Sequence, residues 1–191
     1  MTTPARPLHN VTPVFRAGVA VERFHADVLV IAGTAPGWLA DVDITLDRLS
    51  ALGLRVHLLA VNRAIAEIST TIDHAATVHP GHLRGWLEAG GCVGDQRPLT
   101  HGPALSGSVD VAWPSPVSLG GSSHLAVLAG LGLGYPRLIL AGVCLDTGTP
   151  YEPMQKLWWR DCNAFADRVR CASRGWLRTM LGAPDAEWLE V

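Results

Sequence analysis

The stretch Ala26-Asp-Val-Leu-Val-Ile-Ala-Gly-Thr-Ala-Pro-Gly37 joins a nearly continuous apolar run to a turn of small residues. An apolar run without alternation is typical of a strand that helices cover on both faces, as in parallel sheets. Residues 38–52 place apolar side chains at mixed helical spacing, with charged residues between them, and so predict a helix. Strand, turn and helix in this order indicate an α/β protein.

The same alternation continues along the chain. Apolar runs predict further strands at residues 54–61, 75–79, 109–113 and 137–143, a last edge strand at 187–191, and a strand or hairpin within 14–22. Helical spacing predicts helices over residues 62–68, 82–89, 122–133 and 154–173. We therefore expect one α/β domain over residues 14–191, with a mostly parallel sheet of about six strands between two layers of helices. Residues 1–13 contain three prolines without periodicity and predict a flexible arm.

Composition narrows the class of protein. The chain has 191 residues, of which 48% are hydrophobic and 17% charged, which predicts a packed core rather than disorder. The formal net charge of -2 gives no basic footprint, so duplex nucleic acid is not expected as a partner, whereas a small nucleotide stays open. The N-terminal residues lack a signal-peptide core and no apolar run is long enough to cross a bilayer. We therefore expect a cytoplasmic protein without a membrane partner.

Ligands on parallel sheets bind beyond the carboxyl ends of the strands. In this chain those ends are predicted at Gly33 to Gly37, at Asn62, at His79 to Gly81, before Gly120, and at Gly142 to Asp146. The turn Gly33-Thr-Ala-Pro-Gly37 could bring backbone N–H groups close to a phosphate at a helix N-terminus. It is neither a Walker loop nor a G-x-G-x-x-G fingerprint, and a plain strand-to-helix turn is an equal alternative.

The glycines of residues 120–134 serve two purposes in this interpretation. Gly120-Gly-Ser-Ser123 could contact a ligand, although Ser122 could instead cap the following helix. Gly130, Gly132 and Gly134 lie at the end of a helix and before a strand, which is the reverse of a phosphate loop. They are explained by close packing of helix on strand and by helix termination.

His79, His124 and Asp146 are the candidates for general acid or base, because each lies at or just after a predicted strand end or ligand-facing turn. For the two histidines, a hydrogen-bonded core position or a solvent-facing position is the alternative. A site formed by His74, His79 and His82 is not expected, because a strand would separate the first two by about 16 Å.

A metal ion is neither required nor excluded by the pattern. Asp43, Asp73 and Asp146 could contribute to a Mg²⁺ site if the ligand carries phosphate, since Mg²⁺ commonly uses one or two carboxylates together with phosphate oxygens. No spacing in the chain demands such a site. The four cysteines show no C-x-x-C spacing, so a zinc ribbon or redox motif is not predicted.

Several of these segments, taken in order, carry a family resemblance. Gly33-Thr-Ala-Pro-Gly-Trp38, Val61-Asn62, Val78-His-Pro80 and the run from Ser122 through Leu-Gly-Tyr135 to Gly142-Val143 cover residues 28 to 146. Together they resemble the Rossmann-like family of 6-hydroxymethylpterin diphosphokinase-type proteins, and the related bacterial lipooligosaccharide sialyltransferases that use a CMP-sugar.

The resemblance implies a three-layer Rossmann-like fold and a pocket for a nucleotide or nucleotide-sugar. It implies that Gly33, Thr34, Pro36, Gly37 and Asn62 hold phosphate and ribose, that Ser122 donates to a phosphate, and that Gly142, the glycine of the last strand, also belongs to the nucleotide site. Thr34 and Gly37 are not the residues that the family usually has in the first turn. The expected activity is transfer of a glycosyl or diphosphoryl group. The substrate, the reaction type, the use of a metal and the oligomeric state stay open.

The departures from the family pattern weigh against the reaction more than against the fold. Cys144 stands where the family has an acidic residue, and Asp146 is displaced by two positions. No histidine follows His124, so the late catalytic base of the sialyltransferases has no counterpart. A non-catalytic binding or assembly protein with the same fold, of a kind that a phage could encode, is therefore the alternative. A nucleoside or base hydrolase is a weaker one, because it would need convergent carboxylates.

Overall fold

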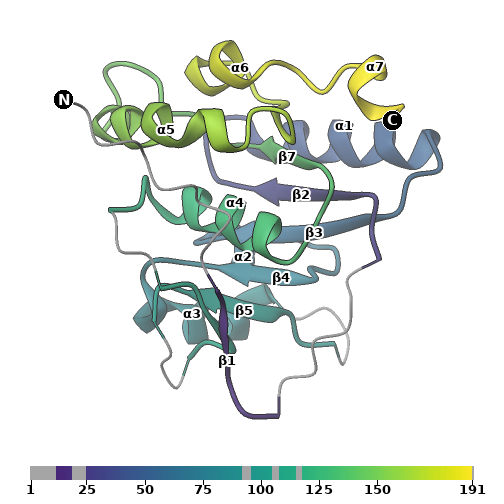
Figure 1. The fold of residues 1–191 in the computed structure, drawn as a ribbon. Helices are drawn as coiled ribbons and strands as arrows, with labels where there is room; N and C mark the ends of the chain where they lie inside the picture. Colours follow the sequence, from purple (N-terminus) through teal and green to yellow (C-terminus); the bar gives the residue numbers. More distant parts are fainter. Residues whose placement is uncertain (1–11, 19–24, 92–95, 105–107, 115–117, 191) are drawn as a thin grey trace.

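The structure, a computed structural model, describes residues 12–18, 25–91, 96–104, 108–114 and 118–190 (Figure 1). Its centre is an eight-stranded sheet with the strand order β1-β6-β5-β4-β3-β2-β7-β8. The strands are β1 (Val14–Phe15), β2 (Val28–Ala32), β3 (Val56–Val61), β4 (His74–Ala76), β5 (Leu99–Gly102), β6 (Val111–Ala112), β7 (Leu138–Ala141) and β8 (Val169–Cys171). All neighbouring strands are parallel except β1, which pairs with β6 in the antiparallel sense.

The order of the strands defines a switch point between β2 and β7. From β2 the chain steps outward through β3, β4, β5 and β6, each beside its predecessor, and then returns to place β7 and β8 on the other side of β2. The loops that leave β2 and β7 therefore diverge, and a crevice opens between them at the carboxyl ends of the two strands.

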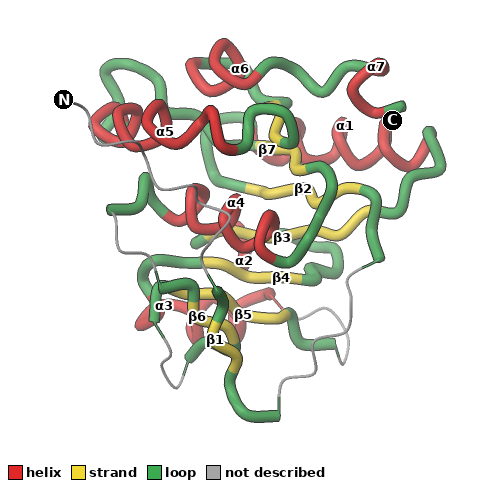
Figure 2. Tube along the Cα trace, viewed as in Figure 1, coloured by secondary structure: helices red, strands yellow, loops and turns green. Residues whose placement is uncertain are grey.

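Helices pack on both faces of the sheet (Figures 1 and 2). Val28, Val30 and Ala32 of β2 belong to one buried cluster, and the alternate residues Leu29 and Ile31 belong to another. The first cluster is covered by α1 (Trp38–Ala51), α2 (Ala64–Glu67), α3 (Pro80–Trp86) and α7 (Ala186–Leu189), and the second by α4 (Ser122–Gly132), α5 (Gln155–Asp161) and α6 (Trp176–Leu181). The unbroken apolar run of β2 is thus explained by burial on both faces.

The packing role predicted for the glycines of α4 is confirmed. A side chain at Gly130 would meet Leu138 and Leu29 at 2.7 Å, and one at Gly132 would overlap the ring of Trp113. Gly134 follows the helix with a φ of 89°, a conformation that favours glycine at a helix end.

The sheet is larger than the six or so strands predicted. β5 was not predicted, because Leu99-Thr-His-Gly102 reads as polar, although its last three residues are buried. The helix predicted over residues 154–173 is wrong in its second half: α5 ends at Asp161, a short 3-10 turn η4 (Cys162–Ala164) follows, and β8 then pairs with β7. Val169 and Cys171 are buried on either side of Arg170, so the spacing of apolar residues in this region fits a strand as well as a helix.

The predicted edge strand at residues 187–191 is also wrong. Residues 186–189 form α7, whose first turn is capped by the Asp185 carboxylate accepting a hydrogen bond of 2.8 Å from the N–H of Trp188. Asx residues are strong helix N-caps, and this signal was overlooked.

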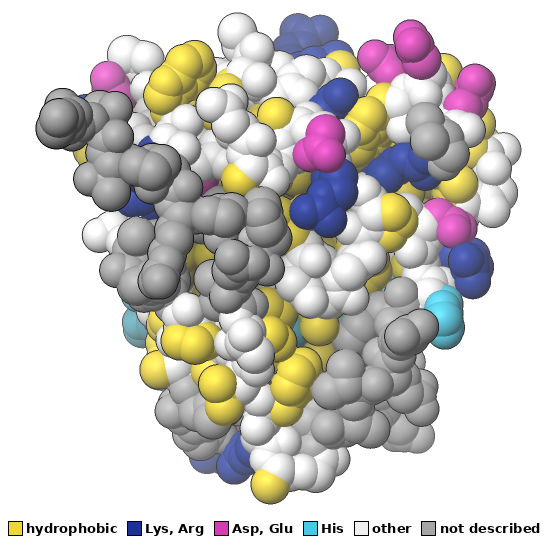
Figure 3. Space-filling model, in the orientation of Figure 1, with side chains coloured by type: hydrophobic (Ala, Val, Ile, Leu, Met, Phe, Trp, Pro, Cys, Tyr) yellow, Lys and Arg dark blue, Asp and Glu magenta, His cyan; other side chains and the backbone are white. Residues whose placement is uncertain are grey.

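Two further expectations concern the ends of the molecule and its surface. Most of the predicted arm, residues 1–11, lies outside the described residues, and only β1 is described from the predicted hairpin. In the described part of the chain no helix is long and apolar enough to cross a membrane. The face drawn in Figure 3 carries basic and acidic side chains interspersed rather than in separate patches.

Candidate ligand-binding site

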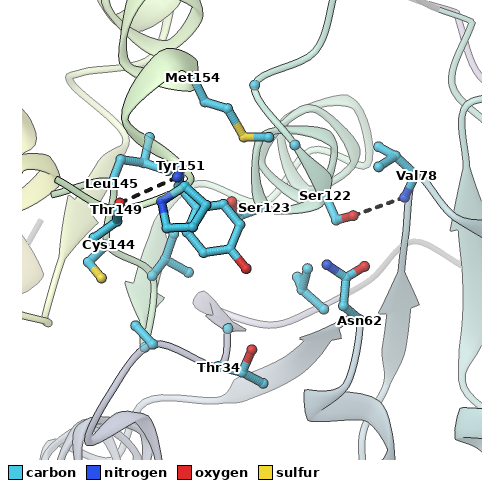
Figure 4. Close-up of a pocket in the computed structure, with 18 of the residues that line it drawn as sticks. Thr34, Asn62, Val78, Ser122, Ser123, Cys144, Leu145, Thr149, Tyr151 and Met154 are labelled. Atoms are coloured by element: carbon cyan, nitrogen blue, oxygen red, sulfur yellow. Dashed lines mark hydrogen bonds between the residues drawn. The ribbon is translucent and has the colours of Figure 1, made fainter. Parts of the chain in front are cut away.

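A cavity of about 680 Å³ lies beyond the carboxyl ends of the strands, at the switch point between β2 and β7 (Figure 4). It is bounded by the segments that follow β2, β3, β4, β5 and β7, by the first residues of α4, and by residues 149–154 of the β7–α5 connection. A volume of this size is in the range of small-molecule sites. The fold thus brings together the strand ends that were predicted from the sequence to face a ligand.

Most of the predicted site residues line this cavity. They are Gly33, Thr34, Pro36, Asn62, His79, Ser122 and Gly142. The other three, Gly37, His124 and Asp146, are not among its lining residues. Gly37 instead precedes α1 with a φ of 78°, where it ends the turn after β2.

Two glycines form the floor between β2 and β7. A side chain at Gly33 would meet the carbonyl oxygen of Gly142 at 2.5 Å, and one at Gly142 would overlap Trp38. The N–H of Ala35 donates to the same Gly142 carbonyl at 2.9 Å. The backbones of the two strand ends are therefore in direct contact, and the floor presents peptide groups rather than side chains.

Asn62 is the strained residue of the site. Its φ is 54°, and among the described residues no other non-glycine residue has a positive φ. Such conformations persist where the surrounding structure enforces them, and they cluster at functional sites. The Asn62 amide oxygen accepts a 2.8 Å hydrogen bond from the Thr77 hydroxyl, so its NH₂ group faces the cavity in Figure 4. Asn62 lies two residues before α2, and the residue between them, Arg63, makes no side-chain cap bond to this helix.

Ser122 joins two walls of the cavity rather than capping α4. Its hydroxyl oxygen accepts a 3.0 Å hydrogen bond from the N–H of Val78. Gly121 precedes the helix with a φ of 90°, and no side chain caps the first turn. The N-terminus of this eleven-residue helix therefore opens onto the cavity with backbone N–H groups available to an anion.

Of the three predicted acid or base residues, His79 alone borders the cavity among the described residues. Its side chain is exposed, and its backbone N–H donates a 2.9 Å hydrogen bond to the Thr77 hydroxyl, the group that also holds Asn62. One hydroxyl thus fixes both the amide and the start of α3 at this edge.

His124 lies behind the cavity wall. Its ring is fully buried, stacks on Trp158 at a centroid distance of 4.9 Å, and accepts at Nδ1 a 2.9 Å hydrogen bond from the N–H of Gly120. Burial lowers its pKa to about 4, so the imidazole is neutral at pH 7. Among the described residues its Nε2 has no hydrogen-bond partner, and the Asp161 carboxylate lies 3.5 Å away. His124 therefore supports the wall that Gly120 forms, and does not reach the cavity.

Asp146 does not compensate for the missing acid at position 144. Its carboxylate accepts a 2.8 Å hydrogen bond from the N–H of Trp176 and lies against Gly175, at the start of α6. Cys144, in contrast, lines the cavity, and burial raises the pKa of its thiol, with a further contribution from the Asp146 charge. The cavity thus presents a neutral thiol where the resembling family has a carboxylate.

The described lining has no formally charged side chain: lysine, arginine, aspartate and glutamate are all absent from it. Mg²⁺ takes oxygen ligands and usually one or two carboxylates, so the residues present do not fit such a site. Asp73 accepts a hydrogen bond from the N–H of Leu58, and Asp43 is on α1. Among the described residues, no group of three histidine, cysteine or acidic side chains could hold a metal ion.

Sequence reasoning missed a buried chain of polar side chains beneath the other end of α4. Trp113 Nε1 donates to His101 Nδ1 (3.0 Å), and His101 Nε2 then faces His74 Nδ1 (3.0 Å). His74 Nε2 bonds to the Tyr135 hydroxyl (2.7 Å), which bonds to His57 Nδ1 (2.6 Å). Because indole can only donate, the hydrogen bonds run in one direction from Trp113 to His57, each group donating to the next, and His101 and His74 each accept at Nδ1 and donate from Nε2.

Burial shifts the pKa values of three of these side chains. It lowers the pKa of His101 to about 3 and that of His74 well below its ordinary value, the second with help from the neighbouring histidines. It raises the pKa of Tyr135, so the phenol keeps its proton. We call these five residues the buried network.

Comparison of the chain with family models, with curated proteins and with solved structures found no match.

Proposed function

We propose that the chain is a three-layer Rossmann-like protein that binds a nucleotide or nucleotide-sugar in the cavity at the switch point. The observation that supports this most directly is the placement of the cavity: it collects the turn after β2, Asn62 after β3 and the N-terminus of α4 at the one position where open parallel sheets receive ligands. In the proposed complex a phosphate accepts hydrogen bonds from the N–H groups at the start of α4, and Asn62 donates to the ribose or the base.

In the transferase form of this proposal, His79 is the base. It is the one predicted acid or base that borders the described cavity, and its exposed ring could reach a hydroxyl group of an acceptor substrate. The reaction would be a glycosyl or diphosphoryl transfer, in which His79 removes the proton of the attacking hydroxyl and the nucleotide portion leaves.

Isothermal titration with CMP, UDP, GDP, ATP and a pterin, each with and without Mg²⁺, tests the proposal. We expect at least one of them to bind, and its affinity to be independent of Mg²⁺, because the cavity offers the ion no carboxylate. Asn62→Ala should weaken binding by about 1 kcal/mol or more through loss of a buried hydrogen bond. Asn163→Ala, which changes an exposed asparagine in η4, is the matched control. Binding by none of the compounds would contradict the proposal.

The second candidate function is binding without catalysis. It is favoured by the position of the predicted catalytic side chains, since Asp146 is held by Trp176 and His124 is enclosed behind Gly120. The two candidates differ in turnover. A bound nucleotide-sugar, or ATP with a pterin, is incubated with the protein and the products are separated by mass. Product formation that His79→Ala abolishes supports the transferase, and binding without any product supports the binding protein.

A further inference from the structure

Tyr151 stands out among the aromatic side chains because it lines the cavity and is nevertheless 54% exposed. In Figure 4 its ring extends into the cavity, and its hydroxyl points into the space bounded by Asn62, Ser122 and Thr34. Among the described residues no group bonds to this hydroxyl and no aromatic ring stacks on Tyr151. A large ring held in a cavity without a partner leaves a face open to a ligand.

Local hydrogen bonds hold the segment that carries Tyr151. The N–H and hydroxyl of Thr149 both donate to the Asp146 carbonyl, at 3.2 and 2.7 Å. The Glu152 carboxylate accepts from the N–H of Gly148 at 2.7 Å, and the N–H of Met154 donates to the Tyr151 carbonyl at 2.9 Å. The ring is therefore presented from a fixed backbone, which lowers the entropy cost of using it for binding.

The surroundings of Tyr151 define what the ring would contact. Met154 closes the cavity beside it and packs against Gly121, where an added side chain would meet its sulfur at 3.0 Å. The Asn62 NH₂ group faces the same space, and among the described residues it has no acceptor. The site thus offers a flat apolar surface and, across the cavity, a donor pair, without a formal charge. These features suit a flat heteroaromatic ring with a carbonyl oxygen or an unprotonated nitrogen on its edge.

We infer that Tyr151 is the residue that selects for the ring of the ligand, by stacking on a heteroaromatic base whose polar edge accepts from Asn62. This inference rests on the proposed function and goes beyond it, because neither the sequence patterns nor the resemblance pointed to Tyr151. Tyr151 contacts the base, whereas the phosphate accepts hydrogen bonds from the N–H groups at the start of α4.

The experiment compares wild type with Tyr151→Leu, Tyr151→Phe and Trp159→Ala. The first removes the ring but keeps apolar bulk, and the second removes only the hydroxyl. The third is the matched control, since Trp159 is an exposed aromatic residue on α5 that does not line the cavity. Affinities for CMP, UMP, AMP and GMP are measured by titration, and ribose 5-phosphate is titrated as the probe without a ring. Circular dichroism and thermal unfolding establish that each variant is folded.

Tyr151→Leu should weaken binding of the preferred mononucleotide by about tenfold or more, as expected for loss of a stacked base. Tyr151→Phe and Trp159→Ala should stay within about threefold of wild type, and ribose 5-phosphate should bind to wild type and to Tyr151→Leu equally. If wild type binds a mononucleotide but Tyr151→Leu binds it as tightly, or if Tyr151→Phe loses as much as Tyr151→Leu, the inference is overturned while the proposed function stands. If wild type binds none of the mononucleotides, nor the nucleotides tested above, the proposed function fails and takes the inference with it.

Discussion

At its C-terminal end α4 covers the buried network, in which polar side chains bond to one another, whereas at its N-terminal end it borders a cavity where polar side chains point into open space. Gly132 of α4 packs on Trp113 of the network, and Ser122 of the same helix lines the cavity. Both clusters contain histidines. His74 and His101 are fully buried, while His79 is exposed at the cavity.

Whether a polar group has a hydrogen-bond partner separates the structural cluster from the candidate functional one. A buried polar group without a partner costs free energy, so a structural cluster is expected to satisfy itself, as the network does. In the cavity the Asn62 NH₂ group and the Tyr151 hydroxyl have no partner among the described residues. Unused donors in a concave site are available to a ligand. The comparison also shows why the number of histidines near one another in sequence was a poor guide to the site.

Acidification should have the largest effect on stability, and it acts through three buried histidines, of which His74 and His101 belong to the network and His124 lies behind the cavity wall. Unfolded histidines take up a proton below a pH of about 6.5, whereas the folded pKa values of His74, His101 and His124 are lowered by burial. The unfolded state therefore binds more protons, and stability is fully present above about pH 6.5 and is lost as the pH falls toward the folded pKa values, about 3 for His101 and about 4 for His124.

In that window each of these histidines lowers the free energy of unfolding by about 1.4 kcal/mol for each pH unit of acidification, and the three together lower it by about 4 kcal/mol per pH unit. Urea denaturation at a series of pH values measures the slope. His124→Gln removes one titrating group and should reduce the slope by about a third. A free energy of unfolding that is constant between pH 7 and pH 5 would show that burial does not lower the pKa values of the three rings.

Substitution of His101 removes a central member of the network. His101→Ala removes the acceptor of the Trp113 indole and the donor to His74 Nδ1, so the buried indole N–H and His74 Nδ1 each lose the hydrogen bond that His101 makes to them. We expect a loss of about 3 kcal/mol or more in the free energy of unfolding. His79→Ala, at the exposed histidine of the cavity, should cost less than about 0.5 kcal/mol. Chemical denaturation of both variants provides the measurement, and equal losses would remove the distinction between the two clusters.

Substitution of Asn62 should affect nucleotide affinity more than stability. Asn62→Gly removes the amide but accepts the φ of 54° without strain. We expect its stability to stay within about 1 kcal/mol of wild type, while nucleotide affinity falls by a factor of about five or more, in line with the loss of one hydrogen bond. Asn62→Ala should bind as weakly as Asn62→Gly and unfold more easily, because it keeps the strain. Binding by Asn62→Gly at wild-type affinity would show that the amide does not contact the ligand.

The sequence predicted the parts of the fold in which local pattern and tertiary burial agree. The unbroken apolar run of β2 and the helical spacing of α1 each fit one type of secondary structure, and that type is observed. The apolar spacing of residues 154–173 is compatible with two structures, because Val169 and Cys171 are also buried in a strand that pairs with the edge of β7. Long-range pairing decided that region, and it is not visible in a local window.

The same contrast holds for the candidate site. Gly33, Asn62 and Ser122 could be placed near one another because parallel strands end at one edge of the sheet. Asp146 and His124 could not be excluded from the cavity without knowing that Trp176 and Gly120 bind them. Tyr151 carried no signal at all, since its role depends on where a loop of glycine, threonine and proline places it.

The floor made by Gly33 and Gly142 limits where the lining of the cavity could change by substitution. Since each glycine excludes a side chain by direct contact with the other strand's backbone or with Trp38, substitutions there would separate β2 from β7 rather than reshape a pocket. A new lining is therefore expected to arise at the rim, at residues such as Tyr151 and His79, whose side chains are exposed. The sheet would be inherited unchanged while the rim diverges.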